Sequence, residues 1–231
     1  MRHLIVGMGN LGTDLAAALK AVGDVVIEWS PRSSHPIEVL KSSEPDFVWI
    51  TAGAGSVGEA KKDFRPFLQL HINLVNDFVK AFNVPVICFS TDYAAGPDSG
   101  ASLYALSKMW MEDLIKFYGK NRNDVFAIRV GSLYGAHYPE RTFPYKLLKN
   151  YPAPTEVKLP ANLVTPTPTA WLAEVLAENY PRLKNQYASQ PILELAPFGS
   201  VSILDWGKII LGEKYSYSGV SLFDKERPMI S

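Results

Sequence analysis

A glycine-rich turn near the start of the chain constrains the fold more than any other feature of the sequence. It follows the apolar segment 4–6 directly and opens a stretch in which apolar residues recur at helical spacing. The turn consists of Gly7, Met8, Gly9, Asn10, Leu11 and Gly12. Glycines at this spacing allow a tight turn, close approach of a pyrophosphate and close helix–strand packing, and the helix N-terminus offers free N–H groups to the anion. The context predicts a dinucleotide-binding turn, the alternative being a glycine-rich turn without a ligand.

Apolar segments and helical patterns alternate along the chain. Strands are expected at 4–6, 25–27, 47–50, 84–89, 125–128 and 192–195, and helices at 64–82, 102–118, 171–180 and 201–211. This alternation favours an α/β protein with a Rossmann doubly wound parallel sheet and helices on both faces. We expect residues 1–135 to form the dinucleotide-binding domain. Residues 136–231 would form a small substrate-binding lobe interleaved with the last sheet elements, because many prolines interrupt its first part.

Charge and cysteine content exclude several classes of partner. The 23 basic and 23 acidic side chains cancel, and no long basic run favours nucleic acid or an anionic membrane. Cys88 is the only cysteine and lies in an apolar strand, so the sequence predicts neither an intrachain disulfide nor a metal site. No basic leader or long apolar segment is present, which favours a cytoplasmic protein. A small polar molecule is the expected substrate.

The end of the second strand indicates which dinucleotide binds. NAD-binding proteins place an acidic residue there to bond the ribose hydroxyls. Here Ser30 stands near that position and Arg32 follows it, so a guanidinium is available to clamp a 2′-phosphate. Glu28 is the competing NAD signal, but it comes one or two residues early and strand alternation can direct it elsewhere. NADP is therefore the expected cofactor; NAD and a merely solvated Arg32 remain the alternatives.

A tyrosine and a lysine stand one helical turn apart after the fourth strand. Tyr104 and Lys108 project from the same face of the helix expected at 102–118. A nearby ammonium favours the phenolate and lowers the tyrosine pKa from about 10, which makes the phenol a proton donor and acceptor. The hydroxyl-bearing segment Ser90 to Asp92 ends the fourth strand, at the sheet edge where ligands bind. The alternative is a surface tyrosine with an unrelated lysine.

The order of these motifs resembles the short-chain dehydrogenase/reductase superfamily. The segments 90–93, 104–108 and 129–135 are similar to the dTDP-4-dehydrorhamnose reductase branch of its extended class, which is related to the NAD-dependent epimerases and dehydratases. The segments 162–167 and 227–231 resemble further motifs of that branch. The resemblance implies a monomer or homodimer that acts on a small molecule, in particular a nucleotide-sugar.

The resemblance also implies roles for individual residues. Tyr104 would be the general acid, Lys108 would hold the nicotinamide ribose and lower the pKa of Tyr104, and Thr91 would bond the substrate carbonyl. Residues Thr51, Ala52 and Gly53 would flank the cofactor; Ser90, Asp92, Tyr93, Ser132 and Thr167 would bind substrate; and Asn73 would match an asparagine of the family. The implied activity is NADP-dependent reduction of a keto group on a nucleotide-linked sugar or similar molecule. A nucleotide-sugar epimerase or dehydratase, and a non-catalytic NADP-binding regulatory protein, are the alternatives.

Overall fold

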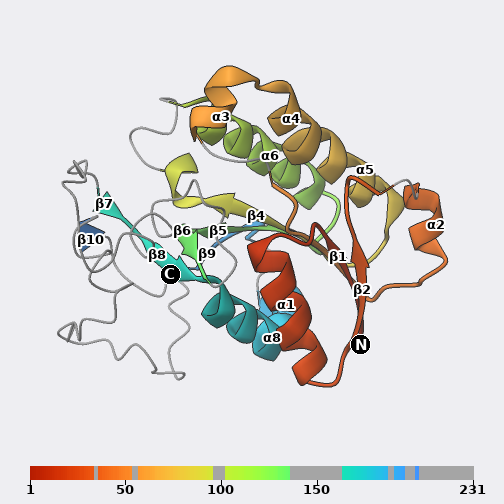
Figure 1. The fold of residues 1–231 in the computed structure, drawn as a ribbon. Coiled ribbons are helices and arrows are strands. Elements are labelled where there is room, and N and C mark those ends of the chain that lie inside the picture. Colours follow the sequence, from red (N-terminus) through yellow and green to blue (C-terminus); the bar gives the residue numbers. More distant parts are fainter. Residues whose placement is uncertain are drawn as a thin grey trace, which may run out of the picture.

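A parallel sheet of six strands forms the centre of the protein in the computed structural model, which describes residues 1–33, 36–53, 57–95, 102–135, 163–186, 190–195 and 201–202 (Figure 1). Its strands are β1 (Arg2–Val6), β2 (Val25–Trp29), β3 (Phe47–Ile50), β4 (Val86–Thr91), β5 (Val125–Val130) and β9 (Ile192–Leu195). Their order is β2-β1-β3-β4-β5-β9, and all neighbours are parallel. The chain reverses its direction of travel across the sheet between β1 and β3, where a crevice for ligands is expected.

Helices cover both faces of this sheet (Figure 1). One face packs against α1 (Asn10–Ala21) and α8 (Thr169–Gln186), and the other against α5 (Leu74–Ala81) and α6 (Leu103–Gly119). Strand alternation divides the core, because Ile5 belongs to the α1–α8 side while its neighbours Leu4 and Val6 belong to the other. The expected doubly wound Rossmann fold is therefore confirmed.

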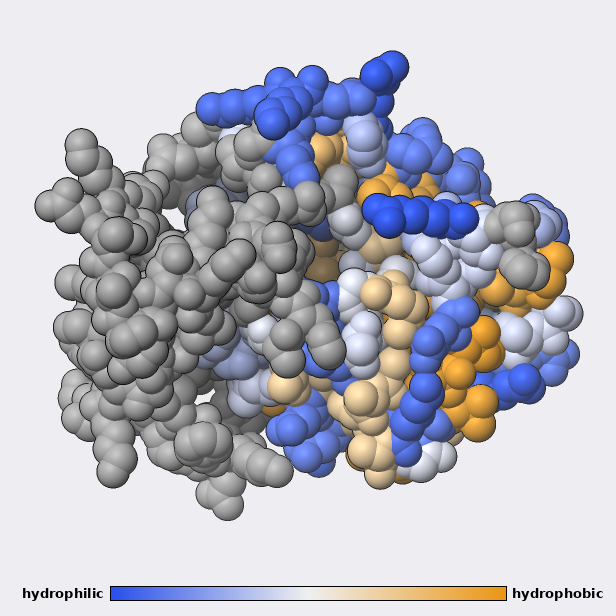
Figure 2. Space-filling view, viewed as in Figure 1, coloured by the Kyte–Doolittle hydropathy of each residue, from blue (hydrophilic) through white to orange (hydrophobic). Residues whose placement is uncertain are grey.

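Three short helices complete the main α/β unit: α2 (Ile37–Lys41), α3 (Val57–Lys62) and α4 (Arg65–Leu68). Figure 2 shows a hydrophilic surface over α3 and α4, at the top of the view, so the outer sides of these helices face solvent. None of the helices in the described part of the chain is long and apolar enough to cross a membrane.

The helix expected over 64–82 is interrupted by a wider turn. After α4 the chain forms a π-helical segment, η1 (Gln69–Asn73), and then continues as α5. A π turn accommodates one more residue than an α turn and is often found at functional sites. Here it carries His71, which is buried.

Two small sheets flank the carboxyl ends of the main strands. Strand β6 (Ser132–Tyr134) pairs in parallel with β8 (Pro166–Pro168), and β7 (Leu163–Val164) pairs antiparallel with β10 (Val201–Ser202). The helix expected at 201–211 is thus wrong for its first two residues, because they pair with β7 instead; the remainder lies outside the described residues. A short 3-10 turn, η2 (Asp92–Ala94), follows β4 directly.

Candidate active site

The glycine-rich turn lies where β1 ends and α1 begins. Gly7 has φ +106°, and a Cβ there would lie 2.5 Å from the backbone of Ala52. A Cβ on Gly12 would lie 2.0 Å from the carbonyl oxygen of Gly7, so both positions require glycine. A Cβ on Gly9, in contrast, would meet nothing within 4 Å, which leaves this side of the turn open to a ligand.

The start of α1 is suited to an anion. Gly9 provides no side-chain cap, and the first turn of the helix contains no acidic residue. The first N–H groups of any α-helix have no intrahelical acceptor, so those of α1, which no side-chain cap or carboxylate occupies, are available to an anion. The Thr51 hydroxyl donates to the carbonyl oxygen of Gly7, with the carbonyl oxygen of Val6 at 3.2 Å, which fixes the end of β3 against the turn.

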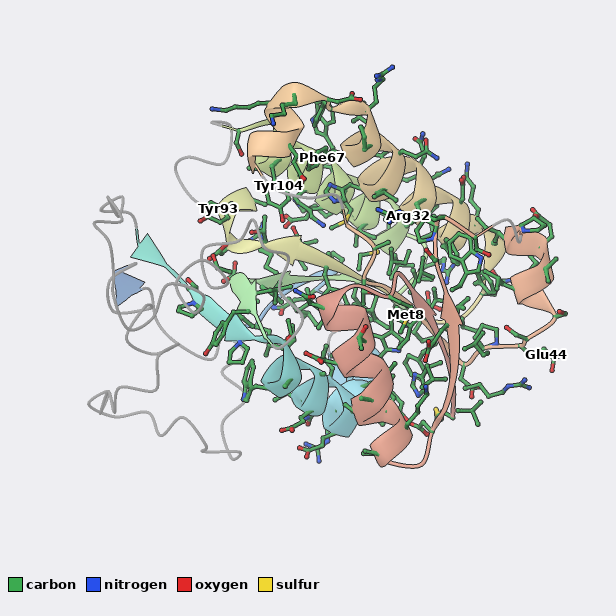
Figure 3. All side chains as sticks on the ribbon, viewed as in Figure 1. Met8, Arg32, Glu44, Phe67, Tyr93 and Tyr104 are labelled. Carbon is green, nitrogen blue, oxygen red and sulfur yellow. The ribbon has the colours of Figure 1, made fainter. Side chains whose placement is uncertain are left out.

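One pocket of about 480 Å³ brings together most of the site residues expected from the sequence. Those that line it are Gly9, Asn10, Leu11, Thr51, Ala52, Gly53, Ser90, Thr91, Tyr93, Tyr104, Lys108 and Ser132. They come from the turn, from the ends of β3 and β4, from α6 and from β6. Figure 3 shows Tyr93 and Tyr104 near each other at this end of the sheet.

Lys108 lines the pocket, and its ammonium group is bonded to the backbone of β4. Its side chain is buried, and Nζ donates a hydrogen bond to the carbonyl oxygen of Phe89 at 2.7 Å. Burial lowers the lysine pKa to about 8, although Cys88 and Glu112 partly oppose this shift. The ammonium form therefore still predominates at neutral pH.

Tyr104 differs from the sequence expectation in one respect. Its pKa is raised to about 12 rather than lowered, first because the surrounding protein desolvates the phenolate and then because Asp92 and Tyr93 are near. The expected lowering by Lys108 is absent, and Nζ donates to the carbonyl oxygen of Phe89 instead. Tyr104 is thus a neutral phenol that can donate a proton.

The hydroxyl groups at the end of β4 already have partners. Thr91 Oγ1 donates to Asp92 Oδ1 at 3.1 Å, and burial raises the pKa of this carboxyl group. Ser90 Oγ donates to Glu112 Oε1 at 2.6 Å, and Glu112 in turn accepts two hydrogen bonds from Arg129. The Ser90 hydroxyl therefore belongs to a buried hydrogen-bond network. Asp92 does not line the pocket.

A second hollow of about 520 Å³ adjoins the end of β2 and is lined by Met8, Glu28, Trp29, Ser30, Ser33, Val39 and Leu40. Arg32 is exposed beside it, and its backbone N–H donates to Ser30 Oγ at 3.2 Å (Figure 3). Glu28 forms an ion pair with Lys20 of α1 at 2.7 Å. Glu28, the residue that would favour NAD, is thus paired with a lysine, whereas Arg32 is exposed to solvent.

Two residues expected at the site lie elsewhere. Thr167 is fully buried in β8, where its register partner is Leu133 of β6, and it does not line the pocket. Asn73 is exposed and donates from Nδ2 to Gln69 Oε1 at 3.0 Å. Among the described residues, no group of acidic, histidine or cysteine side chains is arranged to hold a metal ion.

His71, which no motif of the sequence indicated, lines the same pocket two residues before Asn73. Its ring is 1% exposed and edge-on to Tyr104, with 6.2 Å between the ring centroids. Burial and the Lys108 charge hold its pKa well below the ordinary value, so the imidazole is neutral. The only sequence signal was its place two residues before Asn73, within the helix expected over 64–82.

No protein-family model and no curated protein sequence matches the chain. Solved structures do match its fold. UDP-N-acetylglucosamine 4-epimerase from Methanobrevibacter ruminantium, in complex with UDP-N-acetylmuramic acid, is 16% identical with a TM-score of 0.70, over 90% of this chain and 80% of that one. The dTDP-glucose 4,6-dehydratase from Bacillus anthracis, in complex with NAD, is 12% identical with a TM-score of 0.70, over 93% and 82% of the two chains.

RMD from Pseudomonas aeruginosa, complexed with NADPH, is 16% identical with a TM-score of 0.67, over 90% of this chain and 82% of that one. The fold is therefore the one found in nucleotide-sugar epimerases and dehydratases. It is the fold that the resemblance to the extended short-chain dehydrogenase/reductase class implied.

Proposed function

We propose that the protein is an NADP-dependent reductase of a keto group on a nucleotide-linked sugar or a similar small molecule. The observation that carries this proposal is that the glycine-rich turn lines the same pocket as Thr91, Tyr104 and Lys108. An anion-binding helix start and a proton donor beside an ammonium are the groups that hydride transfer to a carbonyl requires.

The residues present fit a nicotinamide dinucleotide. The open face at Gly9 and the uncapped start of α1 suit its pyrophosphate, and Lys108 would hold the ribose next to the nicotinamide. Ser30 and Arg32, beside the second hollow, would hold a 2′-phosphate. When bound in reduced form, the cofactor supplies a hydride to the substrate carbonyl carbon.

Tyr104 would donate the proton that the developing alkoxide takes up. A pKa of about 12 keeps the phenol protonated at neutral pH, so the proton is available. The phenolate left behind is costly in this desolvated place, and the Lys108 ammonium is the cation on the same helix face that would offset the cost.

Thr91 would orient the carbonyl oxygen next to Tyr104. Its one hydroxyl proton now points to Asp92 Oδ1, so binding a carbonyl requires the hydroxyl to turn towards the pocket.

Epimerisation or dehydration of a nucleotide-sugar is the second candidate. The observation that favours it is Asp92, which lies behind Thr91 and accepts its hydroxyl proton, so that a second titratable group stands next to the residue proposed to bond the carbonyl. Several solved structures with this fold are those of epimerases and dehydratases.

The distinguishing experiment is to incubate the protein with a panel of keto-sugar nucleotides and NADPH while measuring both cofactor and sugar. Oxidation of one NADPH per sugar converted supports the reductase. Conversion of sugar without net change in cofactor supports the second candidate. Tight binding of NADPH with no turnover of any sugar contradicts both and supports a regulatory protein.

A further inference from the structure

His71 is held in place by one of its two ring nitrogens. Its Nδ1 lies 2.9 Å from Ser107 Oγ, and the same oxygen lies 2.7 Å from the carbonyl oxygen of Tyr104. A hydroxyl has one proton to donate, and the short distance shows that Ser107 donates it to the carbonyl oxygen of Tyr104. Ser107 therefore accepts from His71, so the proton of the neutral imidazole is on Nδ1 and Nε2 has a free lone pair.

Nε2 is buried and finds no hydrogen-bond partner in the part of the chain that the structure describes. A Cβ built on Gly53 would lie 3.8 Å from Nε2, so the nitrogen faces the cofactor side of the pocket. Buried acceptors are seldom left unpaired, because the loss of hydration is unfavourable, and an exception at a pocket points to a ligand.

The surroundings fix His71 in this orientation. The π-helical segment η1 carries it, and the rings of Phe67 and Tyr104 pack edge-on around it at centroid distances of 5.8 and 6.2 Å. Figure 3 shows Phe67 and Tyr104 close together between α4 and α6. An acceptor fixed by packing discriminates among ligand groups better than one on a mobile loop.

The bonding partner must carry a proton. Phosphate oxygens and a keto group are acceptors, and the adenosine half of a dinucleotide would lie at the hollow beside Ser30 and Arg32, away from His71. His71 and Lys108 line the same pocket, which places the imidazole near the group proposed to hold the nicotinamide ribose. A ribose hydroxyl there is a donor of the right kind.

We propose that His71 is a positioning residue whose Nε2 accepts a hydrogen bond from a hydroxyl of the ribose that carries the nicotinamide. The inference rests on the proposed cofactor and extends it to a residue that the sequence motifs do not contain. The same nitrogen would weaken binding of a ligand that offers only acceptors at that place.

Two substitutions separate the two nitrogens. In His71→Asn the amide NH₂ takes the place of Nδ1–H, so the bond to Ser107 is kept and the Nε2 acceptor is lost. In His71→Gln the longer side chain places its amide oxygen near Nε2, so the acceptor is kept and the bond to Ser107 is lost. Dissociation constants would be measured for NADPH and for adenosine 2′,5′-bisphosphate, which lacks the nicotinamide ribose, together with the free energy of unfolding without ligand.

We expect His71→Asn to weaken NADPH binding by about three- to tenfold, which is the worth of one hydrogen bond. Binding of adenosine 2′,5′-bisphosphate should not fall in His71→Asn, whereas its free energy of unfolding should, because the ring contacts with Phe67 and Tyr104 are lost. His71→Gln should bind NADPH within about twofold of wild type. Unchanged NADPH affinity in His71→Asn overturns the inference, as does equal weakening of both probes. A loss confined to the KM of the sugar substrate would assign Nε2 to the sugar and also overturn it. Failure of the wild type to bind any dinucleotide rejects the proposed cofactor itself.

Discussion

Two buried histidines at opposite ends of the sheet differ in how many partners they have. His3, near the start of β1, receives a hydrogen bond from Trp49 Nε1 at 3.0 Å and bonds Asp24 through Nε2 at 3.1 Å. Tyr180 also donates to Asp24, at 2.8 Å. His71, at the carboxyl ends of the strands, has only one of its nitrogens bonded among the described residues. A buried polar group whose hydrogen bonds are all made within the protein contributes to folding, whereas one with an unused donor or acceptor is available to a ligand.

The largest expected effect lies at the pocket end. Tyr104→Phe removes the proposed proton donor, so turnover of an identified substrate should fall by about 10² to 10⁴. The free energy of unfolding should not fall, because only the phenolic hydroxyl is lost. Steady-state kinetics and denaturant unfolding measure the two. Unchanged turnover would show that Tyr104 is not the proton donor. It would also weaken the claim that the His71 end of the sheet serves function while the His3 end serves stability.

The pH dependence of activity should follow Lys108. Its pKa is lowered to about 8, so the charged form is present below this pH and is lost as pH rises through it. Because kcat/KM reports the ionisation of the free enzyme, it should be constant below about pH 8 and fall roughly tenfold per pH unit above it. Lys108→Arg keeps its charge and should lack this fall whatever its absolute rate. A wild-type profile that is flat to high pH would contradict the assignment.

Substitutions at the His3 end of the sheet should change the stability of the protein but not its affinity for the cofactor. Trp49→Phe leaves His3 Nδ1 without its donor, which should lower the free energy of unfolding by about 1–3 kcal/mol. The affinity for NADPH should be unchanged. Trp110→Phe is the matched control, because Trp110 is exposed on α6 and its loss should alter neither quantity. Weaker NADPH binding in Trp49→Phe would mean that the two ends of the sheet are coupled.

The smallest expected effect concerns the choice of cofactor. Arg32→Ala should weaken NADPH binding by about five- to tenfold and leave NADH unchanged, because an exposed guanidinium contributes less than a buried one. Lys116→Ala, an exposed cation on α6, serves as the control for net charge. Equal weakening of NADPH and NADH would show that Arg32 does not recognise the 2′-phosphate.

Much of the sheet and of the pocket lining could be predicted from the sequence. Apolar runs locate the strands, and parallel strands bring their carboxyl ends to one edge, so the glycine turn, Thr91 and the Tyr104–Lys108 pair meet there. The turn residues Gly7 and Gly12 are confirmed as positions at which a Cβ would collide with the backbone.

The remaining features depend on packing between distant segments. Asn73 was expected because it matches an asparagine of the family. The π-helical segment η1, which carries both Asn73 and His71, adds one residue per turn without changing the apolar composition, so nothing in the sequence singled out His71. The raised pKa of Tyr104 results from desolvation, which a spacing of four residues does not reveal. Ser90 is bonded to Glu112 of α6, a partner 22 positions away that no motif indicates.

The most direct test of the account is to titrate the wild-type protein with NADPH and with NADH while following nicotinamide fluorescence. It needs no substrate and examines the pocket on which every proposed role depends. The account predicts saturable binding of both, with NADPH the tighter ligand. The absence of binding of either dinucleotide would contradict it.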